Sequence, residues 1–155
     1  MLILAFLEGY GKDDSGRCVD KVLALGDDDL EHIHDFIQWL FPLPEPSRAQ
    51  PSSPILSADE IQAIRVSSAA QSNLHSATRR MTDFYLHNDH WLREIDHNHL
   101  RISRIIRSLV LLHSKEAAQG FLSVIEGRVE ASGNPVNSES RDYWKWSLDL
   151  KGKKS

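Results

Sequence analysis

Hydrophobic residues recur at helical spacing along almost the whole chain, and no stretch shows the alternation typical of a β-strand. The pattern is clearest in residues 98–113, where the apolar stripe consists of Ile102, Ile105, Ile106, Leu109 and Leu112. A second stripe follows Ser114, a predicted helix cap, and consists of Ala118, Phe121, Leu122, Ile125 and Val129. The pattern predicts an all-α fold, a compact bundle of about six or seven helices packed by ridges into grooves.

The first half of the chain contains shorter elements of the same kind. We expect an apolar turn or helix at residues 2–7, a turn at residues 13–16, and a short helix at residues 19–23 that Gly26 ends. Residues 29–41 predict one amphipathic helix, which Pro42 ends because a residue before proline leaves the α region. Its apolar positions are Leu30, Ile33, Phe36, Ile37, Trp39 and Leu40.

Capping residues predict where the remaining helices begin. Ser57 and Glu60 have the spacing of a capping box, and a longer helix is expected over residues 68–85. Asp96 or Asn98 can cap the helix at residues 98–113, and Ser138 a last short helix. Between the helices, residues 42–56 contain five prolines, at positions 42, 44, 46, 51 and 54. We interpret this segment as a rigid strap after the second or third helix, with a polyproline ligand for another protein as the alternative.

Composition narrows the class of protein. The chain has 155 residues, which suits a single domain over residues 1–150 followed by a basic tail at residues 151–155. The net charge of −4 argues against a generic nucleic-acid or membrane binder. One cysteine, Cys18, excludes an intramolecular disulfide and a cysteine-based zinc site. We expect a soluble, cytoplasmic protein, because no apolar stretch is long enough to span a bilayer.

Several strings carry a family resemblance. The string LEHIHDFIQWLFPL at residues 30–43, followed by Pro46-Ser47, and the string NHLRISRI at residues 98–105 resemble signatures of the opioid growth factor receptor conserved region. Asp14-Ser15-Gly16-Arg17 and Tyr143-Trp144 also fit, so the resemblance covers roughly residues 6 to 146. The resemblance implies the fold. It also implies a microbial member that consists of this domain alone and lacks the C-terminal repeats of the animal members, which are receptors for an opioid peptide. It supplies no catalytic residues.

These observations lead to a predicted ligand site. A helix over residues 29–41 places polar side chains at the edge of an aromatic floor, as a peptide or small-molecule pocket requires. The predicted ligand-binding residues are His34, Asp35, Gln38, Trp39, Phe41, His99, Arg101 and Arg104. In the alternative, the aromatic residues are core, His34 or Gln38 hydrogen-bonds the proline segment, and His99 bonds the loop before its helix.

Other chemistries receive less support from the sequence. Four histidines, at positions 87, 90, 97 and 99, lie near two aspartates, but they lack a metal-ligand spacing, so we predict no metal and no cofactor. The arginines at positions 79, 80, 93, 101, 104 and 107 either bind an acidic partner or form internal pairs and a solvated face.

We therefore predict a non-enzymatic binding domain that recognises a peptide or protein segment. Two alternatives stay open. One is an enzyme or a metal- or cofactor-binding protein that uses the histidine and arginine cluster. The other is a nucleic-acid-associated factor that acts through the arginine face.

Overall fold

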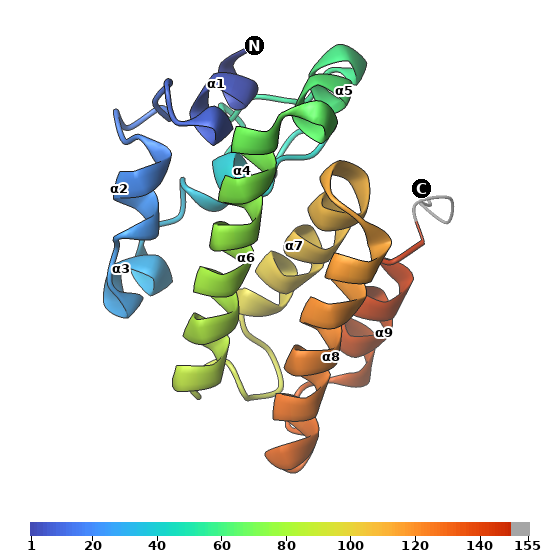
Figure 1. The fold of residues 1–155 in the computed structure, drawn as a ribbon. Coiled ribbons are helices and arrows are strands. Elements are labelled where there is room, and N and C mark those ends of the chain that lie inside the picture. The colour runs from blue at the N-terminus through green and yellow to red at the C-terminus, as the bar shows by residue number, and fades with distance from the viewer. Residues whose placement is uncertain (150–155) are drawn as a thin grey trace. The chain divides into compact units, whose positions relative to one another are not determined.

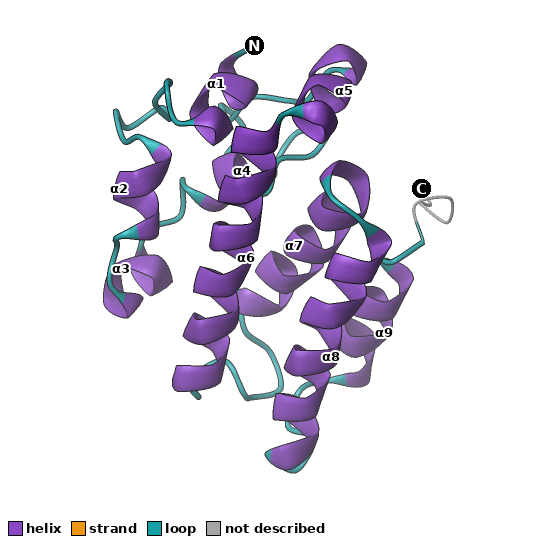
Figure 2. Ribbon diagram, viewed as in Figure 1, coloured by secondary structure: helices purple, strands orange, loops and turns teal. Residues whose placement is uncertain are grey.

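The computed structural model describes residues 1–149, and these residues form nine helices and no strand (Figures 1 and 2). The all-α prediction is confirmed, although the helices are more numerous than expected because three of them are short. The chain divides into two compact units, Met1–Ala77 and the residues from Thr78 onward. A single domain over residues 1–150 stays a prediction, and the predicted basic tail lies outside the described residues.

The first unit contains α1 (Leu2–Glu8), α2 (Val19–Leu23), α3 (Asp27–His32), α4 (Ile37–Leu40), α5 (Ala58–Val66) and the first part of α6 (Ser68–His87). The predicted cap of α5 is confirmed, because the Glu60 N–H donates to Ser57 Oγ at 3.1 Å. The Glu60 carboxylate also accepts the N–H of Leu4 at 2.8 Å. The start of α5 therefore also holds the first turn of α1, which packs against α2, α4 and α5.

The single helix predicted over residues 29–41 is wrong. The helix ends at His32, Ile33 is extended at φ −91° and ψ 129°, and a new helix starts at Ile37. The interruption has a long-range cause, because the Asp35 carboxylate accepts hydrogen bonds from Ser15 and Arg17, which lie 20 and 18 residues earlier. These contacts hold the chain in a non-helical path that periodicity alone does not indicate.

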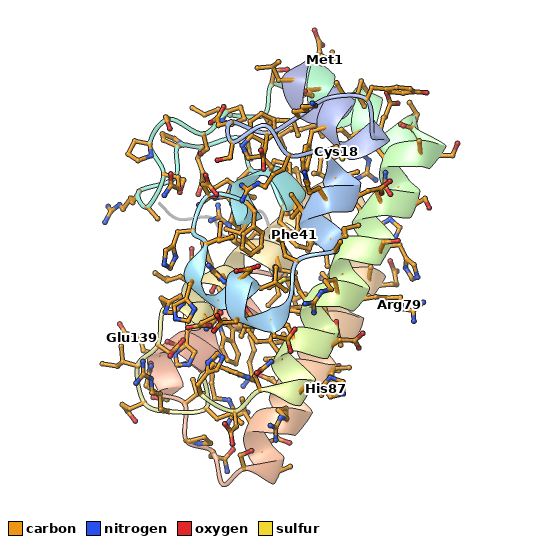
Figure 3. All side chains as sticks on the ribbon, turned by 90° about the vertical axis from the view of Figure 1, so that its left-hand side faces the viewer. Met1, Cys18, Phe41, Arg79, His87 and Glu139 are labelled. Carbon is orange, nitrogen blue, oxygen red and sulfur yellow. The ribbon has the colours of Figure 1, made fainter. Side chains whose placement is uncertain are left out.

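The restart at α4 encloses the string that follows it. Every residue from Phe36 to Leu43 is buried, and the Trp39 ring meets the Phe6 ring edge-on at 5.4 Å. Phe41 is surrounded by other side chains (Figure 3). The alternative in which the aromatic residues are core is therefore confirmed. Pro42 follows directly on Phe41, where the helix ends as predicted.

The proline segment makes specific contacts within the first unit. The Gln38 amide donates to Ser47 Oγ at 3.4 Å, and the Leu56 N–H donates to the Leu43 carbonyl at 3.1 Å. The predicted bond between Gln38 and this segment is therefore confirmed. The segment has no regular secondary structure and precedes α5, and its action as a strap stays a prediction.

The second unit contains the rest of α6 with α7 (Asn98–Leu112), α8 (Lys115–Ala131) and α9 (Ser138–Trp146). α7 packs against both α8 and α9 (Figure 1), and both predicted apolar stripes are buried. Ser114 caps α8 as predicted, since it accepts the N–H of Ala117 at 3.0 Å. The cap predicted for the last helix is wrong by one residue, because Asn137 accepts the N–H of Ser140 at 2.7 Å. The Asn137 carboxamide has the reach to close this turn while it also bonds the loop before α7.

Burial of Trp39 predicts a large loss of stability when its side chain is removed. Trp39 is 2% exposed, and we expect Trp39→Ala to lower the free energy of unfolding by about 3–5 kcal/mol through lost burial and cavity formation. Urea denaturation followed by circular dichroism measures this change. Tyr10→Ala, at a position 84% exposed in the same unit, is the control and should change stability by less than about 0.5 kcal/mol. Equal effects of the two substitutions would contradict the core assignment.

Candidate functional site

A pocket of about 540 Å³ lies within the second unit. Its walls come from the loop between α6 and α7, from α7, and from α9 with its capping residue. The lining residues are Glu94, Ile95, His99, Leu100, Ser103, Asn137, Glu139, Ser140 and Tyr143. All of them belong to one unit, so the second unit alone forms the concavity.

Helical spacing explains why these side chains converge. α7 contributes positions 99, 100 and 103, and α9 contributes positions 139, 140 and 143. Each set follows the spacing i, i+1, i+4, which places its members along one side of a helix. Since α7 packs against α9, these two sides form opposite walls.

His99 and Trp144 join the two helices beneath the pocket. The Trp144 indole N–H donates to the His99 carbonyl at 2.9 Å, and the two rings meet edge-on with centroids 5.8 Å apart. Trp144 is fully buried and His99 is almost so. This pair fixes the spacing of the helices and hence the width of the pocket.

The His99 ring also holds the loop before its own helix. Its Nε2 lies 2.9 Å from the Trp91 carbonyl, and because a carbonyl only accepts, this nitrogen carries the proton. The predicted structural role for His99, a bond to the preceding loop, is confirmed. The buried Trp91 indole in turn donates to the carbonyls of Tyr85 and Asn88.

Asp96 completes the connection between this loop and α7. Its Oδ1 accepts the backbone N–H of Asn98 at 2.9 Å, and its Oδ2 accepts from Arg93 Nε at 2.9 Å. The cap position of α7 is held by His97, which makes no side-chain capping bond, so the prediction of Asp96 or Asn98 as the cap is wrong by one residue. Burial raises the pKa of Asp96. The hydrogen bonds from Asn98 and Arg93 and the nearby His97 lower this pKa by more than burial raises it, so the net pKa is below normal. The carboxylate is thus held in its charged form.

Asn137 connects the start of α9 to the loop between α6 and α7. Its side-chain amide donates to the Glu94 carbonyl at 2.6 Å while its Oδ1 caps α9. The main-chain positions of Glu94 and of the first turn of α9 are therefore fixed together. A pocket whose walls are bonded in this way loses little conformational entropy when it binds a ligand.

The chemical character of the pocket is apolar with acidic additions. Ile95 is 77% exposed, Leu100 72% and Tyr143 38%, which are high values for apolar side chains grouped in one place. Glu94 and Glu139 are the charged lining residues, and neither lysine nor arginine lines the pocket. Glu139 lies at the surface (Figure 3). The arrangement can therefore accept an apolar group and interact with positive charge.

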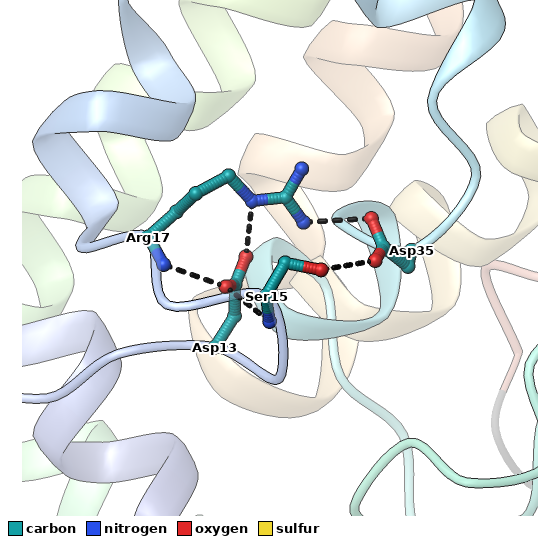
Figure 4. Close-up of polar contacts among 4 residues, drawn as sticks. All are labelled: Asp13, Ser15, Arg17 and Asp35. Atoms are coloured by element: carbon teal, nitrogen blue, oxygen red, sulfur yellow. Dashed lines mark hydrogen bonds and ion pairs between the residues drawn. The ribbon is translucent and has the colours of Figure 1, made fainter.

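A second polar cluster lies in the first unit and has a structural role (Figure 4). Asp13 accepts the backbone N–H groups of Ser15 and Arg17 and the Arg17 Nε–H, and Arg17 Nη2 donates to Asp35 at 2.7 Å. Burial lowers the pKa of Arg17, but its hydrogen bonds to Asp35 and Asp13 raise it more strongly. Burial raises the pKa of Asp35, and the bonds from Ser15 and Arg17 bring it below normal.

Of the eight predicted ligand-binding residues, His99 is the one that lines the pocket. Asp35 is bonded to Arg17, and His34 is exposed on the first unit. Arg104 is half-buried, and both Arg101 and Arg104 have interaction partners. The remaining predicted residues are buried, and they are Gln38, Trp39, Phe41 and Arg101. Their roles as ligand contacts stay predictions.

Sequence reasoning missed most of the pocket. In the sequence, only Ile95 and Leu100 could have indicated the pocket, since they are apolar residues at positions outside any buried stripe. Glu94 and Asn137 carry none, because they meet across 43 residues of intervening chain. Within residues 1–149, no group of three histidine, cysteine, aspartate or glutamate side chains could hold a metal ion.

Comparison with known proteins identifies the first signature string. Residues 23–90 match a family model described as the opioid growth factor receptor conserved region. Over this segment the chain is similar to the conserved region of that family. The predicted resemblance is thereby confirmed for the string at residues 30–43, whereas the string at residues 98–105 lies beyond the matched segment.

Two mammalian relatives extend the comparison. The opioid growth factor receptor of Rattus norvegicus is 32% identical over 116 residues, and that of Mus musculus is 34% identical over 101 residues. These matches cover 61% and 52% of this chain but only 20% and 15% of the two receptors. No solved structure matches the chain significantly. Among the described helices, none is long and apolar enough to cross a bilayer.

The cluster at Asp35 predicts a pH-dependent contribution to stability. Its folded-state pKa lies below the ordinary value of 3.8, so the contribution is present above that pH and is lost as the pH falls through the folded-state pKa. We expect Asp35→Asn to lower the urea midpoint at about pH 7, and the difference from wild type to shrink toward about pH 2. Asp14→Asn, at an exposed position in the same turn, should show a small difference at both pH values. A pH-independent difference for Asp35→Asn would contradict the ion-pair assignment.

Proposed function

We propose that this chain is a non-enzymatic binding domain that receives a peptide or protein segment in the pocket of the second unit. The observation that carries the proposal is the gathering of Ile95, Leu100 and Tyr143, all partly or largely exposed, around a concavity with bonded walls. Exposed apolar groups in one place favour association, because a partner removes them from water.

The chemistry at His99 supports binding rather than catalysis. The His99 Nε2–H donates a hydrogen bond to the Trp91 carbonyl. This nitrogen already carries a proton, so it does not serve as a general base. The Ser103 hydroxyl donates to the His99 carbonyl at 3.2 Å and is likewise occupied. The polar groups at the base of the pocket thus maintain its shape.

Two features of the first unit belong to the same proposal. His34 is exposed, and we retain it as a ligand contact of the first unit. Residues 42–56 act as a strap that covers the buried string, supported by the bonds from Leu56 to Leu43 and from Gln38 to Ser47. The receptor name of the rat and mouse relatives agrees with a binding role.

Selection from a peptide display library tests this function. We expect the full chain to enrich a consistent set of peptides, and Leu100→Ser or Tyr143→Ala to weaken their binding about tenfold or more, as loss of a central apolar contact does. Isothermal titration calorimetry with the enriched peptides measures the change, and circular dichroism checks the fold. Val66→Ser, at a position 83% exposed in the first unit, is the matched control and should bind as wild type does. Enriched peptides that ignore Leu100 and Tyr143 would refute the pocket as the binding site.

A further inference from the structure

We infer that the pocket selects segments in which a lysine or arginine side chain stands beside a large apolar side chain. This inference rests on the proposed function, because it specifies the chemistry of the partner that the same pocket receives. Two observations support it: two carboxylates line the pocket, and the neighbouring arginines are bonded to other residues.

The two carboxylates are available to a ligand. Glu94 and Glu139 line the pocket, both are exposed, and among residues 1–149 neither side chain has a hydrogen-bond or ion-pair partner. The Glu94 contacts described above involve its backbone carbonyl, which leaves the side chain available. The pocket therefore presents unneutralised negative charge on two of its walls.

Neighbouring cations are already engaged with other acids. Arg93 precedes Glu94, but its Nε donates to Asp96 at 2.9 Å. Arg141 follows Ser140 on α9, but its guanidinium contacts Asn134 at 2.8 Å and Glu130 at 3.3 Å. Because these arginines are bonded elsewhere, the charge on Glu94 and Glu139 remains to be matched by a partner.

The apolar part of the lining selects the form of the cation. Lysine and arginine place a charge at the end of an aliphatic stem, and such a stem packs on exposed side chains such as Ile95 and Leu100. The Tyr143 ring, stacked on Trp146 with centroids 5.2 Å apart, adds an aromatic face that attracts cations. A flanking apolar side chain then covers the rest of the concavity.

The same charges exclude other classes of partner. A nucleic acid or a phosphorylated segment would bring further negative charge against Glu94 and Glu139, at a cost in Coulomb energy. A wholly apolar segment would cover both carboxylates and remove them from water without compensation. A basic and apolar segment meets neither cost.

A positional-scanning library of N-acetylated octapeptides tests the inference, because acetylation removes the amino-terminal charge and leaves side chains as the source of cations. We expect lysine or arginine to be enriched at one position next to leucine, isoleucine, phenylalanine or methionine. For the best peptide, Glu94→Gln and Glu139→Gln should each weaken binding about threefold, as a partly exposed ion pair does, and the loss should be smaller at high salt. Glu116→Gln, an exposed glutamate on α8 outside the pocket, is the matched control and should have no effect.

The outcomes separate this inference from the proposed function. Peptides that require Leu100 and Tyr143 but show no preference for lysine or arginine, and no response to either glutamine variant, would overturn the inference alone. Enrichment of acidic peptides, or binding that needs a free amino terminus instead of a basic side chain, would also overturn it. Absence of any peptide that depends on Leu100 and Tyr143 would overturn the proposed function as well.

Discussion

His99 connects three segments that are far apart in the sequence. Its ring donates to the carbonyl of Trp91, its own carbonyl accepts the indole proton of Trp144, and the His99 and Trp144 rings meet edge-on. Because a buried polar atom without a partner is costly, displacement of any one segment would leave a donor or acceptor unpaired. The base of the pocket is therefore fixed by hydrogen bonding. The side chains of Glu94 and Glu139, which line the pocket, take no part in that bonding.

The polar residues of the first unit determine the path of the chain. Asp35 is bound by Ser15 and Arg17, and this contact interrupts a stretch that periodicity would make a single helix. The interruption allows the residues that follow to be buried on all sides instead of along one stripe. An ion pair that is partly exposed contributes modestly to stability, yet here it decides which residues form the core.

Features that depend on neighbouring residues could be predicted from the sequence, whereas features that depend on long-range contacts could not. The stripes of α7 and α8 and the caps at Ser57 and Ser114 depend on residues within one or two turns, so the sequence contains all the information needed. The break at Ile33 depends on partners 18 and 20 residues away, which periodicity does not register. The pocket depends on the pairing of α7 with α9, and of the two predicted roles of His99, ligand contact and loop anchor, only the second has a defined bonding partner.

The uninterrupted burial of Phe36 to Leu43 has a consequence for detection of the protein. This string lies within the segment that matches the opioid growth factor receptor conserved region, and the native fold buries all of it. An antibody raised against a peptide of this sequence would find its epitope only after the chain is denatured, so it would report the protein on a blot and miss it in an immunoprecipitation from native extract. These residues of the matched segment are thus inaccessible to an antibody in the folded molecule.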